Sequence, residues 1–390
     1  MVPVFWVAGD DHDFAEANHA WILTGTGDPA RIVLRERPAE APQLPLAKEP
    51  CGPEITAALE ALRADTPNTE FKDDVLRWLT EAYAPTATLA DAFAAAIHAL
   101  LAPRGLVVFR AHHPAAKRAA APWLLKGRGQ VLPDGLAPVL VDAAAGRDRL
   151  RPEEGGKTFV TRRSGERFSL PDLDRLAQDT PERLSPNVLL RPVVESALFP
   201  TLAYAAGPGE LEYLPDAAAL YESLGVDRQT PVPRWSGVVV EGRVEKLMQK
   251  HGLTIADFEG PPGALEAHLV SEALPPEVAA AFADLRRHIE EGYNRVAKNI
   301  AAIDPTLERT AQSARNAGLG GTQDVEKKLV ASLKRANEAL IGQVARARAS
   351  VYPGGKPQER VLTLPSFLIR YGPELVDVLA AEVARWTDAP

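Results

Sequence analysis

The first apolar run of the chain is continuous, with no alternation of polar and apolar positions. Residues 2–8 read VPVFWVA and are rich in β-branched and aromatic side chains. Such a run is typical of a central strand buried on both faces of a parallel sheet. A second run, 105–109 (GLVVF), follows an alanine-rich helix predicted over 88–101. A helix followed by a buried strand is the repeating unit of α/β domains, so the pattern predicts an α/β core with parallel pairing.

The remainder of the first 236 residues also alternates between short strands and helices. We predict strands over 21–24, 32–34, 188–190 and 232–240, and helices over 53–63 and 71–83. Residues 115–180 mix Arg, Lys and Pro with short apolar runs, which indicates an inserted or peripheral segment. We expect strands over 157–162 and 166–170 inside it and assign it no chemistry. Residues 1–236 are therefore interpreted as one domain with an insertion around 115–180.

From residue 237 the pattern becomes helical. Apolar residues recur at the 4-3-4 spacing of a coiled coil at Val278, Phe282, Leu285 and Ile289, and return at Val325, Leu329, Leu333 and Leu340. Asp304-Pro305 predicts a kink or restart, and Ala317–Gly321 (AGLGG) predicts the reversal. We expect an all-α domain over 237–390 with an antiparallel coiled-coil hairpin over about 275–351. Helices over 364–386 should dock back, and the hairpin is expected to serve for dimerisation or for bracing of the domain.

Composition narrows the functional class. The 390 residues are 46% apolar and 25% charged, with a net charge of −8 and a pI near 5.6. This acidic balance argues against binding nucleic acid or anionic membranes. A single cysteine, Cys51, excludes an internal disulfide and suits a reducing compartment. No apolar run has membrane-spanning length and no signal peptide is recognisable, so we expect a cytoplasmic protein.

Candidate chemistry first occurs where the opening strand ends. Gly9 leads into Asp10, Asp11, His12 and Asp13, at the sheet edge where open α/β sheets place their sites. Acidic residues also favour a helix N-terminus, but three aspartates around a histidine exceed what capping requires. The cluster could bind an amine, orient a base or hold a divalent cation. Its spacing fits no recognised metal motif, so we predict no dedicated metal site.

A second candidate region spans residues 184–213. Arg191 and Glu195 interrupt an apolar segment, so burying that segment requires partners for both charges. Gly207, Gly209 and Glu210 belong to a turn whose glycines allow close approach of the backbone to a ligand. The alternative interpretation is a core strand, helix and loop in which Arg191 and Glu195 only pair with each other.

Four motifs together resemble the bacillithiol biosynthesis family BshC. They are PVFWVAGDDHDFAEANH (3–19), LSPNVLLRPVVESALFPTLAYAAGPGELEY (184–213), IDPTL (303–307) and KPQERVL (356–362). The resemblance runs over essentially the whole chain. It implies a Rossmann-like core related to nucleotidyl-transferring synthetases, with insertions, and a C-terminal coiled coil that dimerises. The implied reaction is the addition of L-cysteine to glucosaminyl-malate as the last step of bacillithiol synthesis. By analogy with related ligases, ATP with Mg²⁺ would activate the cysteine carboxylate as an adenylate.

The resemblance also implies roles for the candidate residues. His12 would act as a base or hydrogen-bond donor, and Asp13 would orient it or bind a substrate amine. Arg191 would hold a carboxylate or phosphate and Glu195 would orient Arg191. The residues expected to face the site at the end of the first strand are Asp11, His12, Asp13, Asn18 and His19. Those expected to line the pocket wall are Gly207, Gly209 and Glu210.

Two alternatives remain open at this point. Members of the family begin with a further strand and a glycine-rich turn, whereas this chain begins at Met1-Val2-Pro3, so part of the nucleotide cleft is expected to be absent. A catalytically inactive, truncated homologue acting as a dimeric interaction protein would fit that start. The enzyme alternative is a metal-dependent hydrolase that uses the cluster from Asp10 to Asp13.

Overall fold

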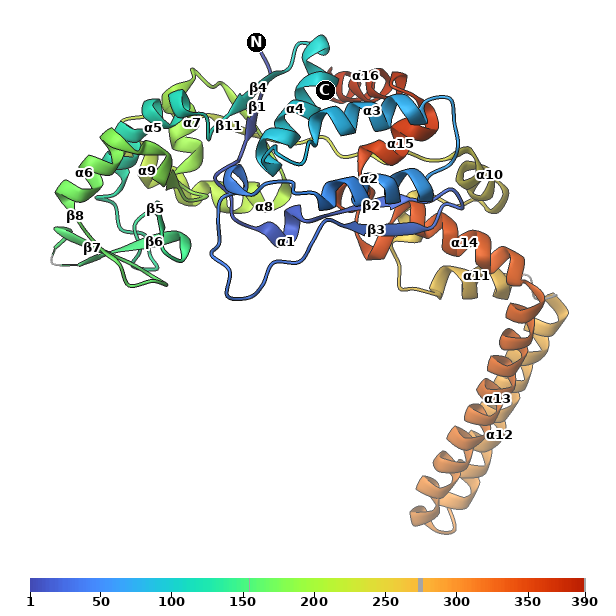
Figure 1. The fold of residues 1–390 in the computed structure, drawn as a ribbon. Helices are drawn as coiled ribbons and strands as arrows, with labels where there is room; N and C mark the ends of the chain where they lie inside the picture. Colours follow the sequence, from blue (N-terminus) through green and yellow to red (C-terminus); the bar gives the residue numbers. More distant parts are fainter. Residues whose placement is uncertain (154, 273–275, 389–390) are drawn as a thin grey trace. The chain divides into compact units, whose positions relative to one another are not determined.

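The structure is a computed structural model that describes residues 1–153, 155–272 and 276–388. It divides into two compact units (Figure 1). The first unit contains residues 1–26, 30–236 and the segment from Leu362 onward, and the second contains residues 27–29 and 237–361. The segment from Leu362 thus groups with the first unit, although its sequence position continues the helical region. Residue 275, the predicted start of the hairpin, lies outside the described residues.

Within the described residues, the first unit carries the strands, except for Pro29 at the start of β3, and most of the short helices. Its strands are β1 (Val4–Val7), β2 (His19–Leu23), β3 (Pro29–Val33), β4 (Val107–Arg110), β5 (Val139–Ala143), β6 (Gly146–Glu153), β7 (Thr158–Thr161), β8 (Arg167–Ser169), β9 (Leu184–Pro186), β10 (Ala203–Ala206) and β11 (Thr230–Pro233). Its helices are α1 (Phe14–Ala17), α2 (Glu54–Asp65), α3 (Lys72–Ala82), α4 (Leu89–Leu101), α5 (Pro114–Gly127), α6 (Leu170–Asp179), α7 (Arg191–Leu198), α8 (Pro208–Tyr213), α9 (Ala218–Leu224), α15 (Leu364–Tyr371) and α16 (Glu374–Asp388).

The opening strand pairs in parallel with the strand predicted over 105–109. β1 and β4 align Trp6 with Phe109, whose ring centroids lie 4.7 Å apart. The parallel pairing is confirmed, but the prediction that the first strand is buried on both faces is wrong. Val4 and Phe5 remain 44% and 37% exposed. The buried Val7 packs against Ala90 and Ala94 of α4, so the apolar run is covered mainly toward its carboxyl end.

The segment predicted as an insertion forms most of an antiparallel sheet. Its strand order is β8-β7-β6-β5-β9, and β7 and β8 confirm the strands predicted over 157–162 and 166–170. The strand predicted over 188–190 is wrong, because these residues turn into α7. The Asn187 carboxamide oxygen accepts hydrogen bonds from the backbone N–H groups of Leu189 at 3.1 Å and Leu190 at 2.9 Å. This asparagine turn outweighs the strand preference of the apolar residues that follow it.

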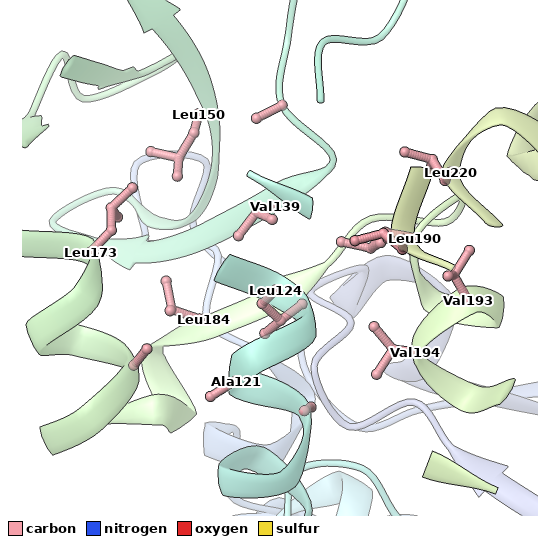
Figure 2. Close-up of a cluster of buried hydrophobic side chains, with 14 of the residues drawn as sticks. Ala121, Leu124, Val139, Leu150, Leu173, Leu184, Leu190, Val193, Val194 and Leu220 are labelled. Atoms are coloured by element: carbon pink, nitrogen blue, oxygen red, sulfur yellow. The ribbon is translucent and has the colours of Figure 1, made fainter. Parts of the chain in front are cut away.

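A large apolar core holds this sheet to its helices. Leu124 of α5, Leu184 of β9 and Leu190 are each about 1% exposed or less. Figure 2 shows their side chains gathered with those of Val139 and Val194 between the sheet and the surrounding helices. Leu190 is thus buried as its apolar character requires, but through a turn and not through a strand. The other parallel pair, β10 and β11, ends at Pro233, well short of the predicted residue 240.

Apart from Pro29, the first residue of β3, the regular secondary structure described in the second unit is helical. It contains α10 (Gly242–His251), α11 (Ala264–Glu272), α12 (Pro276–Ala301), α13 (Glu308–Ala336) and α14 (Glu338–Val351). Figure 1 shows α12 and α13 side by side, which confirms the antiparallel hairpin. The reversal predicted at 317–321 is wrong, since the chain turns at 302–307, where the Asp304 carboxylate accepts a hydrogen bond from the Thr306 N–H at 2.9 Å.

Gly318 explains why the glycine-rich stretch does not reverse the chain. It lies inside α13, where a Cβ atom would come within 3.3 Å of Cγ2 of Ile289 on α12. The absence of a side chain therefore permits close packing of the two helices, while glycine costs an internal helix position only about 1 kcal/mol. Asp304-Pro305 instead supplies the rigid, capped turn that a reversal needs.

Candidate functional site

A cavity of about 280 Å³ lies at the carboxyl end of β1, entirely within the first unit. Three segments distant in sequence form its walls. Its lining residues are Trp6, Ala8, Asp10, Asp11, His12, Leu140, Arg147, Arg149, Pro186, Asn187, Val188 and Arg191. The cavity thus brings together the predicted acidic loop, the predicted Arg191 and an unexpected arginine pair from β6.

His12 and Arg147 form the centre of the polar wall. Nη1 of Arg147 lies 3.2 Å from Nδ1 of His12. Because a guanidinium can only donate, Nδ1 is the acceptor and the ring proton of His12 is on Nε2. Burial and the nearby Arg147 charge lower the pKa of His12, although Asp11 acts in the opposite direction. The imidazole is therefore neutral at pH 7 and offers an Nε2–H donor.

Arg147 is fixed by contacts with β9. Its Nε donates to Oγ of Ser185 at 2.8 Å, and its Nη2 donates to the carbonyl of Pro186 at 2.7 Å. These bonds connect β6 to β9 across the intervening β5 and aim Nη1 at His12. The residue is a rigid positive charge in the cavity wall.

Asp10 is held by a buried lysine. Nζ of Lys117 lies 2.8 Å from Oδ1 of Asp10 and donates to the carbonyl of Leu184 at 2.5 Å. Lys117 lies on α5 and is 3% exposed. The pair therefore ties the loop after β1 to β9, and it fixes one carboxylate in the cavity lining.

The other residues of the acidic loop have separate positions. Asp11 lines the cavity, and its Oδ1 accepts the His12 N–H at 2.7 Å. Asp13 does not line it and caps α1 by accepting the Glu16 N–H at 3.2 Å. Asn18, 3% exposed, donates to the carbonyl of Arg35, and its oxygen lies 3.0 Å from Nδ1 of His19. Asn18 and His19 thus support the loop from outside the cavity.

Arg191 enters the cavity from the first turn of α7 and has partners behind it. Its Nη2 donates to the hydroxyl of Tyr204 at 2.9 Å and to Oε1 of Glu210 at 3.0 Å. Its Nε lies 3.5 Å from Oε1 of Glu195, one helical turn further along. Burial disfavours the charge, but the surrounding tyrosines and carboxylates hold the pKa of Arg191 above its usual value. The pairing of Arg191 with Glu195 exists, yet it is one contact within a larger network.

The predicted glycine turn lies next to this network and not in the cavity lining. Gly207 precedes α8, and its N–H donates to Oε2 of Glu210 at 2.9 Å. Gly209 is exposed on the first turn of α8. Apart from its chain neighbours and the backbone of its own helix, no heavy atom lies within 4 Å of the point that a Cβ atom would occupy there. Glu210 contacts the site through Arg191. Gly207 and Gly209 therefore shape the turn that presents Glu210.

Three basic residues of the site were not anticipated from the sequence: Arg147, Arg149 and Lys117. Arg147 comes from the segment to which no chemistry was assigned, and Lys117 from a helix within the same segment. The available signal for Arg147 was the pattern GRDRLR at 146–151, since alternate residues of a strand share one face. For Lys117, the indication in the sequence was a single cationic residue pair within an alanine-rich stretch.

The acidic cluster does not form a metal-binding group. Asp10 pairs with Lys117 and Asp13 caps a helix, so the carboxylates diverge. In the described ranges no three His, Cys, Asp or Glu side chains gather in a way that could hold a metal ion. The described carboxylates therefore do not assemble the set of metal ligands that the hydrolase alternative requires.

Glu195 supplies a prediction about stability. Burial raises its pKa from 4.5 to about 7, with Arg191 opposing and Glu210 reinforcing the shift. Between pH 4.5 and 7 the folded state therefore binds more protons than the unfolded state, and stability falls as the pH rises. Relative to Glu195→Gln, the wild type should lose about 2–3 kcal/mol of unfolding free energy between pH 4.5 and 8. Urea unfolding at pH 4.5 and at pH 8 measures this difference in unfolding free energy.

The matched control is Glu212→Gln, which changes an exposed carboxylate on α8. The unfolding free energy of Glu212→Gln should have the same pH dependence as that of the wild type over this range. An identical pH dependence for wild type and Glu195→Gln would show that Glu195 titrates as an ordinary carboxyl group.

Topology and site together define the class of protein. Parallel strand pairs with a cationic cavity at a strand's carboxyl end describe a Rossmann-like domain, here followed by a helical coiled-coil domain. Among the described helices, none combines the length and apolar character needed to cross a membrane.

Comparison with known proteins agrees with this class. The N-terminal Rossmann-like domain of bacillithiol biosynthesis BshC matches residues 1–127 and 140–235, and the C-terminal coiled-coil domain of BshC matches residues 237–385. The chain belongs to the bacillithiol biosynthesis BshC family.

Relatives from several bacteria carry the name "Putative cysteine ligase BshC". The protein from Salinibacter ruber is 30% identical over 97% of this chain and 73% of its own length. The protein from Symbiobacterium thermophilum is 29% identical over 98% of this chain and 75% of its own length. The protein from Bacillus mycoides is 26% identical over 99% of this chain and 76% of its own length.

Proposed function

We propose that this chain is a cytoplasmic ligase that joins the carboxyl group of L-cysteine to the amine of glucosaminyl-malate, completing bacillithiol. The observation that supports it is the convergence of Arg147, Arg191 and a neutral His12 on one cavity. Both substrates carry carboxylates at neutral pH, and guanidinium groups bind planar anions through paired hydrogen bonds.

The cavity residues divide into two roles in this proposal. Arg191 and Arg147 attract the substrate carboxylates and hold them against a wall formed partly by Trp6 and Leu140. His12 donates through Nε2 to the carbonyl oxygen on which negative charge develops during attack by the amine. Asp11, with a side chain 53% exposed, is placed to receive a hydrogen bond from that amine.

ATP would be the co-substrate that activates the cysteine carboxyl group as an adenylate, with release of pyrophosphate. The attacking amine would then displace AMP and lose a proton. Guanidinium groups suit the phosphates of ATP as well as carboxylates. Mg²⁺ would accompany the nucleotide and screen its phosphate charge. The chain's own contribution is to bind and orient the acids, keep His12 in one tautomer and present its Nε2–H.

We also infer that the hairpin of α12 and α13 joins two copies of the chain. The large apolar side chains of Leu285, Val296 and Val325 are 47%, 49% and 57% exposed on these helices. Exposed apolar residues at coiled-coil spacing favour a helical partner.

The test of the ligase function is product formation by the purified chain. Incubation with L-cysteine, glucosaminyl-malate and ATP-Mg²⁺ should yield bacillithiol by mass spectrometry, and omission of any one reactant should abolish it. His12→Gln should lower the rate while Asp13→Asn, at a helix cap outside the cavity, should not. Absence of product from folded wild-type protein under all conditions would refute the proposal.

A further inference from the structure

We propose that Tyr204 and Glu210 are positioning residues that fix Arg191 so that its Nη1 group faces the bound anion. This inference rests on the proposed function for the identity of the anion. The arrangement of the side chains stands independently of that identity.

The contacts of Arg191 are divided between two sides. Nη2 is engaged by the Tyr204 hydroxyl at 2.9 Å, by Glu210 at 3.0 Å and by the Tyr213 hydroxyl at 3.5 Å, while Nε faces Glu195. Nη1 has no protein partner in the described part of the chain. The residue lines the cavity, so Nη1 is the group available to a ligand.

Tyr204 and Glu210 also hold each other. The Tyr204 hydroxyl donates to Oε1 of Glu210 at 2.8 Å, and Oε2 of Glu210 accepts the Gly207 N–H. The carboxylate is thereby fixed to the first turn of α8, and the hydroxyl is fixed to the carboxylate. Backbone hydrogen bonding keeps the pKa of Glu210 low despite its burial, so the group stays ionised.

These partners come from elements that contribute nothing to the cavity lining. Tyr204 lies on β10 and Glu210 and Tyr213 lie on α8, directly after the carboxyl end of that strand. Their effect on a ligand must therefore pass through Arg191. A long, flexible side chain gains binding strength when its orientation is fixed before the ligand arrives, because less rotational freedom is lost on binding.

Tyr204→Phe tests this with minimal change in volume. It should raise KM for glucosaminyl-malate about tenfold, the effect expected when one hydrogen bond to a charged group is lost, and leave kcat within about twofold. Tyr83→Phe is the control, since it removes a hydroxyl from another partly buried tyrosine whose ring packs away from the cavity. It should change neither constant.

A second measurement does not depend on catalysis. In protein labelled with ¹⁵N-arginine, the Nε–H signal of Arg191, assigned with Arg191→Lys, should be sharp in wild type and Tyr83→Phe. It should broaden or shift in Tyr204→Phe, and phosphate should perturb it at concentrations about tenfold higher than in wild type.

The outcomes separate the two proposals. An unchanged Arg191 signal and unchanged KM in Tyr204→Phe would overturn the positioning role even if the enzyme makes bacillithiol. A broadened signal with weakened phosphate binding would support the positioning role even if wild type makes no product, which would refute only the ligase function.

Discussion

Replacing Arg191 by alanine is expected to lower kcat/KM for glucosaminyl-malate by about 100- to 1000-fold. The substitution removes the cation that faces the cavity and leaves Glu195 and Glu210 without their shared partner. Truncating one member of a buried, hydrogen-bonded charge pair typically costs about 2–5 kcal/mol, which includes this range. Steady-state kinetics measure this loss of kcat/KM, and circular dichroism verifies that the variant is folded.

Arg191→Lys is the informative companion variant. Lysine keeps the charge but cannot contact Tyr204, Glu210 and a ligand with separate nitrogens of one planar group. We expect it to recover little of the loss. A lysine variant with wild-type kinetics would mean that the site needs only a positive charge at this position and that the planar fork is irrelevant.

Removing the Lys117 side chain should have the largest effect on stability. Lys117→Ala leaves the Asp10 carboxylate and the Leu184 carbonyl without their buried donor. Breaking a buried pair by deleting one partner costs about 3–5 kcal/mol, because an uncompensated charge remains. Urea unfolding followed by a probe in the first unit measures this loss.

A double-mutant cycle identifies the cause. Lys117→Met combined with Asp10→Asn removes both charges while preserving most of the volume, so the double variant should be more stable than Lys117→Ala. If the losses of Lys117→Met and Asp10→Asn simply add, the ion pair has no coupling. If Lys117→Met is as stable as the wild type, the loss in Lys117→Ala comes from packing of the methylene chain.

The sequence predicted the elements better than their burial. The helix over 88–101 and the strand after it are found as α4 and β4, since apolar periodicity and the Thr88 cap act locally. The same local information could not show that Val4 and Phe5 stay exposed. Exposure depends on which other segments cover β1, and that is a property of the whole fold.

The predicted position of the hairpin reversal was wrong because the glycine-rich stretch has a different structural role. Gly318 and its neighbours suggested a reversal by composition, but the absence of a side chain at Gly318 instead allows close helix packing against Ile289.

The candidate site was predicted in part. His12 and Arg191 belong to recognisable motifs, whereas Arg147 joins them only because β6 and β9 are both hydrogen-bonded to β5, a long-range pairing that periodicity does not encode.

The return of the chain's last helices to the first unit bears on the order of synthesis. Leu368 and Ile369 are buried in the same core as Ile22 and Leu76, so this core cannot close until the ribosome has passed residue 369. The helical segment from 237 to 361 has been synthesised before that point. The core around Ile22 and Leu76 therefore closes after the helical segment has been made, and until then its open apolar surface is the state that chaperones would need to protect during translation.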